Sequence, residues 1–191
     1  MLNRPLLTVC VAFILLAMSA YQSHGQIVYS GIRNIVIQNP GPDDYISRSI
    51  DLADNSSQSW DNLNFGLFRT STATFGGQTS WSGEPCALAY ETSFPYIERY
   101  AYGVTPTSRF GSGTMFLWNY HHSTPATDKG FFRNTSGYAY LLLGDFDGPK
   151  YYGWVHLNVS DYNLTSGNGP TITLIDWAFD QTPGNKLFMG E

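Results

Sequence analysis

The sequence predicts an all-β fold, an antiparallel two-sheet sandwich of jelly-roll-like type, with about ten strands and little or no helix. Three observations predict this class. Segments dense in β-branched and aromatic residues recur along the chain, turn signals such as NPGPDD, WSGEP and FDGPK separate them, and no long window has apolar residues at helical spacing. A closed barrel is the alternative that the same strands allow.

Residues 1–25 have the features of an export signal. Arg4 supplies a positive charge, and the apolar run over residues 6–17 is too short to span a bilayer. We expect cleavage before Gln26 or, as a second choice, after Ala20; a retained membrane anchor is the other interpretation. No linker, low-complexity tract or repeat divides residues 26–191, so we expect them to form a single β-sandwich domain.

Ten segments after the signal are expected to be strands, because each is short, rich in strand-forming residues and bounded by turn residues. They are 27–38, 45–53, 62–69, 73–78, 87–92, 97–103, 114–121, 138–146, 150–161 and 171–179.

The last two of these strands carry the clearest pattern. In KYYGWVHLNVS, residues 151, 153, 155, 157 and 159 alternate with a second set at 152, 154, 156, 158 and 160, so one face is expected in a core and the other face wetter. Gly153 is expected where a bulky neighbour crosses the strand or where the strand bulges. Pro183 and Gly184 are expected to end the final strand.

Composition and charge limit the classes of molecule that this chain is expected to bind. The chain carries ten Lys and Arg against fifteen Asp and Glu, a net charge of −5, which disfavours nucleic acid and anionic membranes as partners. Charged residues make up 13% of the chain and aromatic residues 16%, a composition found among secreted β proteins and sugar-binding surfaces. Once the signal is removed, Cys86 is the only cysteine; it is either a small buried hydrophobe or a link to another chain.

No residues in the sequence form a recognisable reaction centre. The chain has no GxSxG, HExxH or phosphate-loop motif. His121 and His122 are adjacent, so a strand would send them to opposite faces. His156 lies on the more polar side of its strand, where it could act as a base or ligand only if carboxylates arrived from elsewhere in the fold; otherwise it is a hydrogen-bonded surface histidine. We therefore expect no catalytic residues and no enzyme activity.

Asp145 and Asp147, followed by Gly148, are weak candidates for a Ca²⁺ loop, and no other cofactor is indicated. An EF-type loop would need further oxygen ligands, whereas Pro149 and Lys150 follow instead. A hairpin turn explains the same residues, so we expect no metal site.

Four aromatic residues are candidates for a flat platform that stacks on sugar rings: Trp118, Tyr120, Tyr152 and Trp154. Aromatic side chains at strand spacing more often belong to a core, where indole N–H groups need partners.

The C-terminal part of the chain resembles a group of uncharacterised bacterial exported proteins associated with PEP-CTERM sorting tails. The resemblance lies in YAYLLL from Tyr138, YYGWV from Tyr151, IDWAF from Ile175 and TPG from Thr182, together with the opening QIVYSG. It covers residues 26–38 and 138–191 and implies a protein of the cell surface or extracellular matrix, with no catalytic residues to transfer. No sorting tail follows Glu191 and residues 51–65 match the relatives' Asp-rich loop poorly, so neither exosortase processing nor the family's calcium site is expected.

Three hypotheses for function follow. The first is a non-catalytic, secreted or cell-surface protein that is a structural or adhesive component of the matrix or envelope, with itself or extracellular polysaccharide as partner. The second is a carbohydrate-binding module that uses exposed aromatic side chains, and the third, less favoured, is a secreted hydrolase. Asn-x-Ser/Thr sequons would be glycan sites only in a eukaryotic secretory pathway, whereas the resemblance favours a bacterium; they begin at Asn55, Asn134, Asn158 and Asn163.

Overall fold

The computed structural model describes eleven stretches of the chain: 26–38, 45–52, 62–69, 74–80, 87–90, 96–106, 109–111, 115–121, 129–144, 148–160 and 171–190. Within them the fold is all-β, with antiparallel sheets and no helix. The expected export signal at 1–25, Cys86, His122 and the Asp145–Asp147 loop lie outside these stretches.

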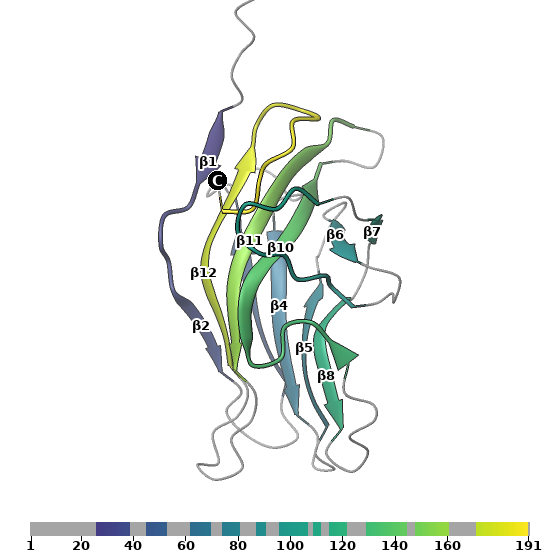
Figure 1. The fold of residues 1–191 in the computed structure, drawn as a ribbon. Helices are drawn as coiled ribbons and strands as arrows, with labels where there is room; N and C mark the ends of the chain where they lie inside the picture. The colour runs from purple at the N-terminus through teal and green to yellow at the C-terminus, as the bar shows by residue number, and fades with distance from the viewer. Residues whose placement is uncertain are drawn as a thin grey trace, which may run out of the picture.

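The described residues form two antiparallel sheets (Figure 1). The seven-stranded sheet has the order β1-β12-β11-β10-β6-β7, and β2 also pairs with β12. The five-stranded sheet has the order β3-β4-β5-β8-β9. The strands are β1 (Ile27–Tyr29), β2 (Ile35–Gln38), β3 (Tyr45–Asp51), β4 (Asn62–Arg69), β5 (Thr74–Ser80), β6 (Ala87–Tyr90), β7 (Arg109–Gly111), β8 (Met115–His121), β9 (Lys129–Gly130), β10 (Thr135–Leu143), β11 (Tyr151–Ser160) and β12 (Thr171–Asp180).

Most predicted strands lie close to observed ones, and the differences have local causes. The expected strand 27–38 is two strands, because Gly31 and Asn34 have positive φ values of 67° and 49° that interrupt the extended backbone. The expected strand 97–103 is not formed; the range holds only isolated bridge residues, Ile97 and Tyr100, and Tyr100 bridges to Tyr138.

Two short strands were missed. β7 and β9 fall within the sequences RFGSG and TDKG, whose glycines we had assigned to turns. With twelve strands in the described residues, some only two to four residues long, the expected count of about ten is not confirmed.

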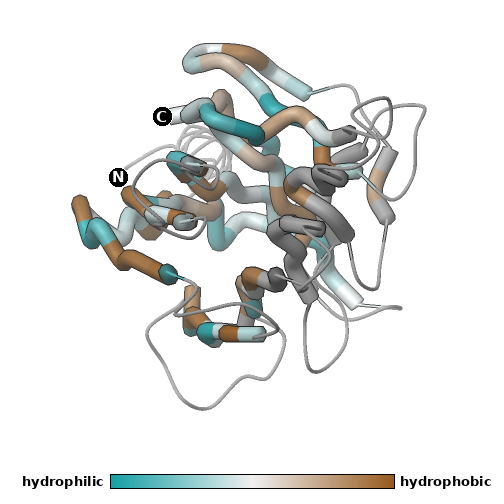
Figure 2. Tube along the Cα trace, turned by 90° about the horizontal axis from the view of Figure 1, so that it is seen from below, coloured by the Kyte–Doolittle hydropathy of each residue, from teal (hydrophilic) through white to brown (hydrophobic). Residues whose placement is uncertain are grey.

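One buried cluster draws side chains from both sheets. From the seven-stranded sheet it takes alternate residues such as Val155, Leu157 and Val159, and from the five-stranded sheet Phe65 and Leu117. The expected core face of β11 is therefore confirmed. Figure 2 looks along the strands and shows both hydrophobic (brown) and hydrophilic (teal) residues on the coloured strands. Burial of these aliphatic side chains supplies the main favourable free energy of folding.

A one-residue bulge in β12 reverses which residues face this core. His156 pairs with Asp176 but Leu157 pairs with Leu174, so Ile175 is an extra residue opposite β11. Before the bulge Leu174 points into the core, and after it Trp177 does. Strict alternation from Leu174 would have turned Asp176 inward, whereas the bulge turns this carboxylate to the other face of the sheet.

The opposite, outer face of the seven-stranded sheet is partly covered. Tyr140, Trp154 and Ala178 form a second buried cluster there with Leu187 and Met189 from the C-terminal segment. The segment is turned back over the sheet after β12, where Asp180, itself buried, accepts hydrogen bonds from the Thr182 backbone N–H at 2.7 Å and from the Asn185 amide. Gly184 has φ of 78°, which explains the glycine in the predicted exit turn.

Replacing Gly153 with alanine should destabilise the protein. A Cβ there would lie 2.6 Å from the Ala178 carbonyl oxygen and 2.8 Å from Phe179 Cβ, so the prediction of a crowded crossing is confirmed. We expect Gly153→Ala to lower the free energy of unfolding by about 1–3 kcal/mol in urea denaturation, the usual cost of overpacking. Ser160→Ala, at the exposed end of the same strand, is the control and should change it by less than about 0.5 kcal/mol. Equal stability of the two variants would contradict this account.

Candidate functional site

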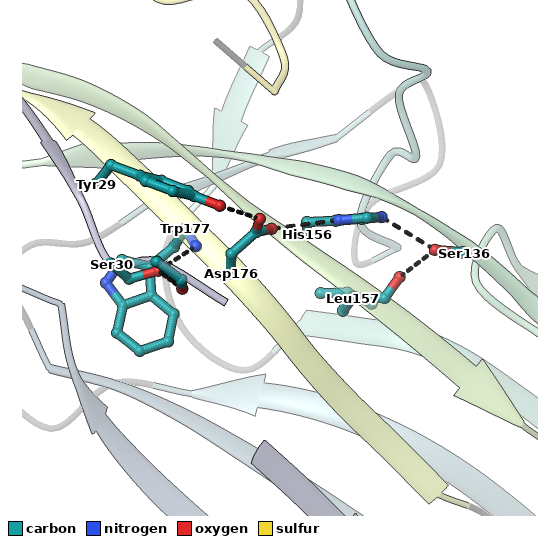
Figure 3. Close-up of polar contacts among 8 residues, drawn as sticks. Tyr29, Ser30, Ser136, His156, Leu157, Asp176 and Trp177 are labelled. Atoms are coloured by element: carbon teal, nitrogen blue, oxygen red, sulfur yellow. Dashed lines mark hydrogen bonds and ion pairs between the residues drawn. The ribbon is translucent and has the colours of Figure 1, made fainter. Parts of the chain in front are cut away.

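A hydrogen-bonded row of four side chains crosses the outer face of the seven-stranded sheet (Figure 3). Tyr29 Oη donates to Asp176 Oδ2 at 2.7 Å. The other carboxylate oxygen, Oδ1, lies 3.2 Å from His156 Nδ1, and His156 Nε2 lies 3.1 Å from Ser136 Oγ. We call Tyr29, Asp176, His156 and Ser136 the outer-face relay.

Strand register brings the relay together from four segments distant in sequence. His156 on β11 pairs with Asp176 on β12 and, on its other side, with Tyr138 on β10. Ser136 is two residues from Tyr138 and so lies on the same face. Tyr29 arrives from β1, which pairs with the far edge of β12.

Hydrogen-bond chemistry limits which atoms of the relay can donate and which can accept. A carboxylate can only accept, so the proton between Asp176 and His156 lies on Nδ1. In the neutral ring Nε2 is then an acceptor, and it can take the hydrogen of the Ser136 hydroxyl. The hydroxyl has one hydrogen and a second acceptor within reach, the Leu157 carbonyl oxygen at 3.2 Å, so it donates to one of the two at a time. The relay thus links a hydroxyl, an imidazole, a carboxylate and a phenol in one chain.

Aromatic rings border the relay. Tyr138 stacks on the His156 ring with centroids 4.3 Å apart and an interplanar angle of 14°. Tyr102 lies 6.4 Å from Tyr138 on one side, and Tyr29 is at the other end of the relay. Tyr102 is 73% exposed and Tyr29 53% exposed, whereas the side chains of His156 and Asp176 are 23% and 13% exposed. Flat apolar rings and hydrogen-bonding groups therefore share one accessible surface.

Two phenols close to Asp176 have raised pKa values. The pKa of Tyr29 is raised above its ordinary value, chiefly by the hydrogen bond to Asp176. The pKa of Tyr138 is also raised, first by burial and then by the Asp176 charge. Because the native state holds these protons more tightly than the unfolded chain does, their contribution to stability is full below about pH 10 and is lost as the pH rises through the native pKa values.

The four aromatic residues proposed from sequence do not form one platform. Tyr152 and Trp154 lie on β11 in the seven-stranded sheet, whereas Trp118 and Tyr120 lie on β8 in the five-stranded sheet. Trp154 is only 1% exposed: it belongs to the buried cluster that includes Leu187 and Met189, and the rings of Tyr138 and Tyr29 lie 5.3 and 6.2 Å from it, so the expectation of an exposed Trp154 is wrong. Tyr152 is partly buried against the same cluster.

The sequence drew attention to His156 but not to its partners. We had required a carboxylate from elsewhere in the fold, and Asp176 supplies it. One signal was available, an isolated acidic residue within the apolar strand TITLIDWAF. Ser136 and Tyr29 carried no signal, because nothing local distinguishes them from other serines and tyrosines of the chain.

Metal and membrane features are not seen in the part of the chain that the structure describes. No three His, Cys, Asp or Glu side chains gather there as possible metal ligands. The same residues hold no helix of the length and hydropathy needed to cross a bilayer.

The described residues thus form an all-β fold with an accessible polar and aromatic surface on one sheet. Comparison of the chain with family models, curated proteins and solved structures gives no match.

Removing the charge of Asp176 should release the phenol of Tyr29. In Asp176→Asn the pKa of Tyr29 should fall toward its ordinary value, because the main cause of its elevation is the bond to the carboxylate. Titration of ¹³C-labelled tyrosine side chains by NMR measures this change. Tyr140 is an internal control: burial is the first cause of its raised pKa, which should stay raised in the variant. An unchanged Tyr29 titration would contradict the assigned hydrogen bond.

Proposed function

We propose that this protein is exported and binds carbohydrate through the outer face of its seven-stranded sheet. The observation that carries the proposal is the stacking of the Tyr138 ring on His156, which itself lies beside Asp176. Two exposed tyrosines, Tyr29 and Tyr102, lie on either side of this group. Sugar rings present apolar C–H faces and many hydroxyl groups. A surface that combines aromatic rings with fixed acceptors and donors suits both features.

The charge of the site favours a neutral saccharide. Asp176 is the acidic member of the relay, and its two oxygens already accept hydrogen bonds from Tyr29 and His156. An anionic sugar placed over this carboxylate would be repelled, whereas a neutral hydroxyl could donate to a free lone pair. The rigid sheet holds these groups in place, which lowers the entropy lost on binding.

We also propose the finer features expected from sequence: a jelly-roll-like sandwich for the two sheets, and a location outside the cell or on its surface. The cluster shared by both sheets supports the sandwich. The export signal and the resemblance of the C-terminal strands to bacterial surface proteins support the location. Calcium remains without support in the described residues.

Truncating the exposed tyrosines should weaken binding without harming the fold. We expect Tyr29→Ala and Tyr102→Ala each to raise the Kd for a bound neutral polysaccharide about tenfold, in line with the loss of an anchor side chain. Affinity electrophoresis of the full chain in gels containing a panel of neutral polysaccharides measures this. Tyr45→Ala, which removes a half-exposed tyrosine from the five-stranded sheet, is the matched control and should bind like the unmodified protein. Failure to bind any polysaccharide would overturn the proposal.

A structural or adhesive role is the second candidate, and one observation favours it. The edge beside β12 exposes apolar side chains, with Ile32 71% and Val36 53% exposed. Edge strands with apolar side chains invite pairing with another copy of the chain.

If copies of the chain associate through this edge, the average mass of the protein in solution should depend on its concentration. If the edge mediates assembly, light scattering should show an average mass that rises with concentration, and Ile32→Lys should lower it by placing a charge in the contact. Lys186→Ala, an exposed residue on the C-terminal segment, serves as the control. A monomer at all concentrations would exclude the role.

A further inference from the structure

We propose that Ser136, His156 and Asp176 form a nucleophilic centre that cleaves O-acyl esters, with Asn158 as the donor to the oxyanion. The choice of an acylated saccharide as substrate rests on the proposed carbohydrate binding; the ester chemistry does not. This inference departs from the sequence-based expectation of a non-catalytic protein, and it follows from contacts that only the fold creates.

The order of the three groups is the first argument. Asp176 contacts Nδ1 of His156, and Ser136 contacts Nε2, at 3.2 and 3.1 Å. These are the roles in a serine hydrolase: the carboxylate orients the imidazole, and the far nitrogen takes the hydroxyl proton. Tyr29 holds the second carboxylate oxygen at 2.7 Å, so Asp176 is itself fixed by a positioning residue.

The second argument concerns the oxyanion that forms when a serine attacks an ester. Backbone N–H groups of a strand lie in the plane of the sheet, so they do not point at an atom above its face. A side-chain donor is needed instead. Asn158 lies directly opposite Ser136 in the β10–β11 register and is exposed, so its amide projects from the same face.

The reaction balances with water as the only co-reactant. Ser136 Oγ attacks the carbonyl carbon while His156 Nε2 takes the hydroxyl proton, and the carbonyl electrons move to the oxygen facing Asn158. The bond to the alcohol oxygen then breaks, and His156 gives its proton to the leaving alcohol. Water attacks the acyl-serine, His156 removes its proton, and return of that proton to Ser136 releases the carboxylic acid.

The surroundings suit an acyl group carried on a sugar. The Tyr138 ring stacks on His156 and lies two residues from Ser136 on the same strand. A sugar ring resting against Tyr138 and Tyr102 would place a substituent over the serine. The bulge at Ile175 lies next to the relay, a position where bulges commonly re-aim a side chain.

The test is hydrolysis of p-nitrophenyl acetate by the full chain, together with fluorophosphonate labelling located by mass spectrometry. The protein should be made in a host without N-glycosylation, because Asn158 begins an Asn-Val-Ser sequon. We expect hydrolysis above the buffer rate and a label on Ser136. Ser136→Ala should lose both, whereas Ser160→Ala, an exposed serine on β11, should keep both.

Two further variants separate catalysis from folding. Asn158→Ala should lower kcat by about 10²–10³-fold with little change in KM, since its amide acts mainly in the transition state. Asp176→Asn should also lower kcat while KM stays close to that of the unmodified protein. Labelling of the unmodified protein remains decisive should a variant fail to fold.

The outcomes distinguish this inference from the proposed binding. Absence of both label and hydrolysis, or hydrolysis undiminished in Ser136→Ala, would overturn the nucleophilic centre and leave carbohydrate binding untouched. Hydrolysis of p-nitrophenyl acetate without release of acetate from acetylated polysaccharide would support the centre and overturn the saccharide substrate.

Discussion

The pairing of β11 with β12, and the single bulge within it, is the constraint on which the rest of the structure depends. β12 has apolar residues at both odd and even positions, and without a shift in the alternation its first acidic residue, Asp176, would point into the core. The extra residue Ile175 lets Leu174 and Trp177 both face inward and places Asp176 beside His156 on the outer face. Burying a lone carboxylate would cost several kcal/mol, so the bulge resolves a conflict that the strand sequence contains.

The same two strands tie the sheets and the termini together. The indole N–H of Trp177 donates to the Leu52 carbonyl at 2.9 Å, which links β12 to the chain just after β3. On its other side, β12 accepts hydrogen bonds at the Ile175 carbonyl from the backbone N–H groups of Arg33 and Asn34, and at the Trp177 carbonyl from that of Ser30. These bonds help to hold the N-terminal edge strands, one of which carries Tyr29.

The outer face of the seven-stranded sheet is divided into a covered and an open half. Trp154 and Tyr140 lie in a buried cluster with Leu187 and Met189 of the C-terminal segment, and this cluster forms on the central strands. Next to it, the outer-face relay is left accessible on the same rigid strands. Groups held on paired strands keep their geometry without further ordering, which favours both the binding and the acyl-transfer chemistry proposed for this surface. Asp176 contributes to both of these proposed activities, because it orients His156 and accepts a hydrogen bond from the phenol of Tyr29.

The sequence by itself determined the all-β class, most strand positions and the core face of β11, because period-two alternation and turn residues are local signals. It also marked His156 as lying on a polar face. Only the tertiary structure decided that Trp154 is buried, since the residues packed around it come from other strands and from the C-terminal segment. Likewise, Ser136, His156 and Asp176 come together only through the register of three strands and one bulge. The sequence of a single strand does not show which distant strand it pairs with.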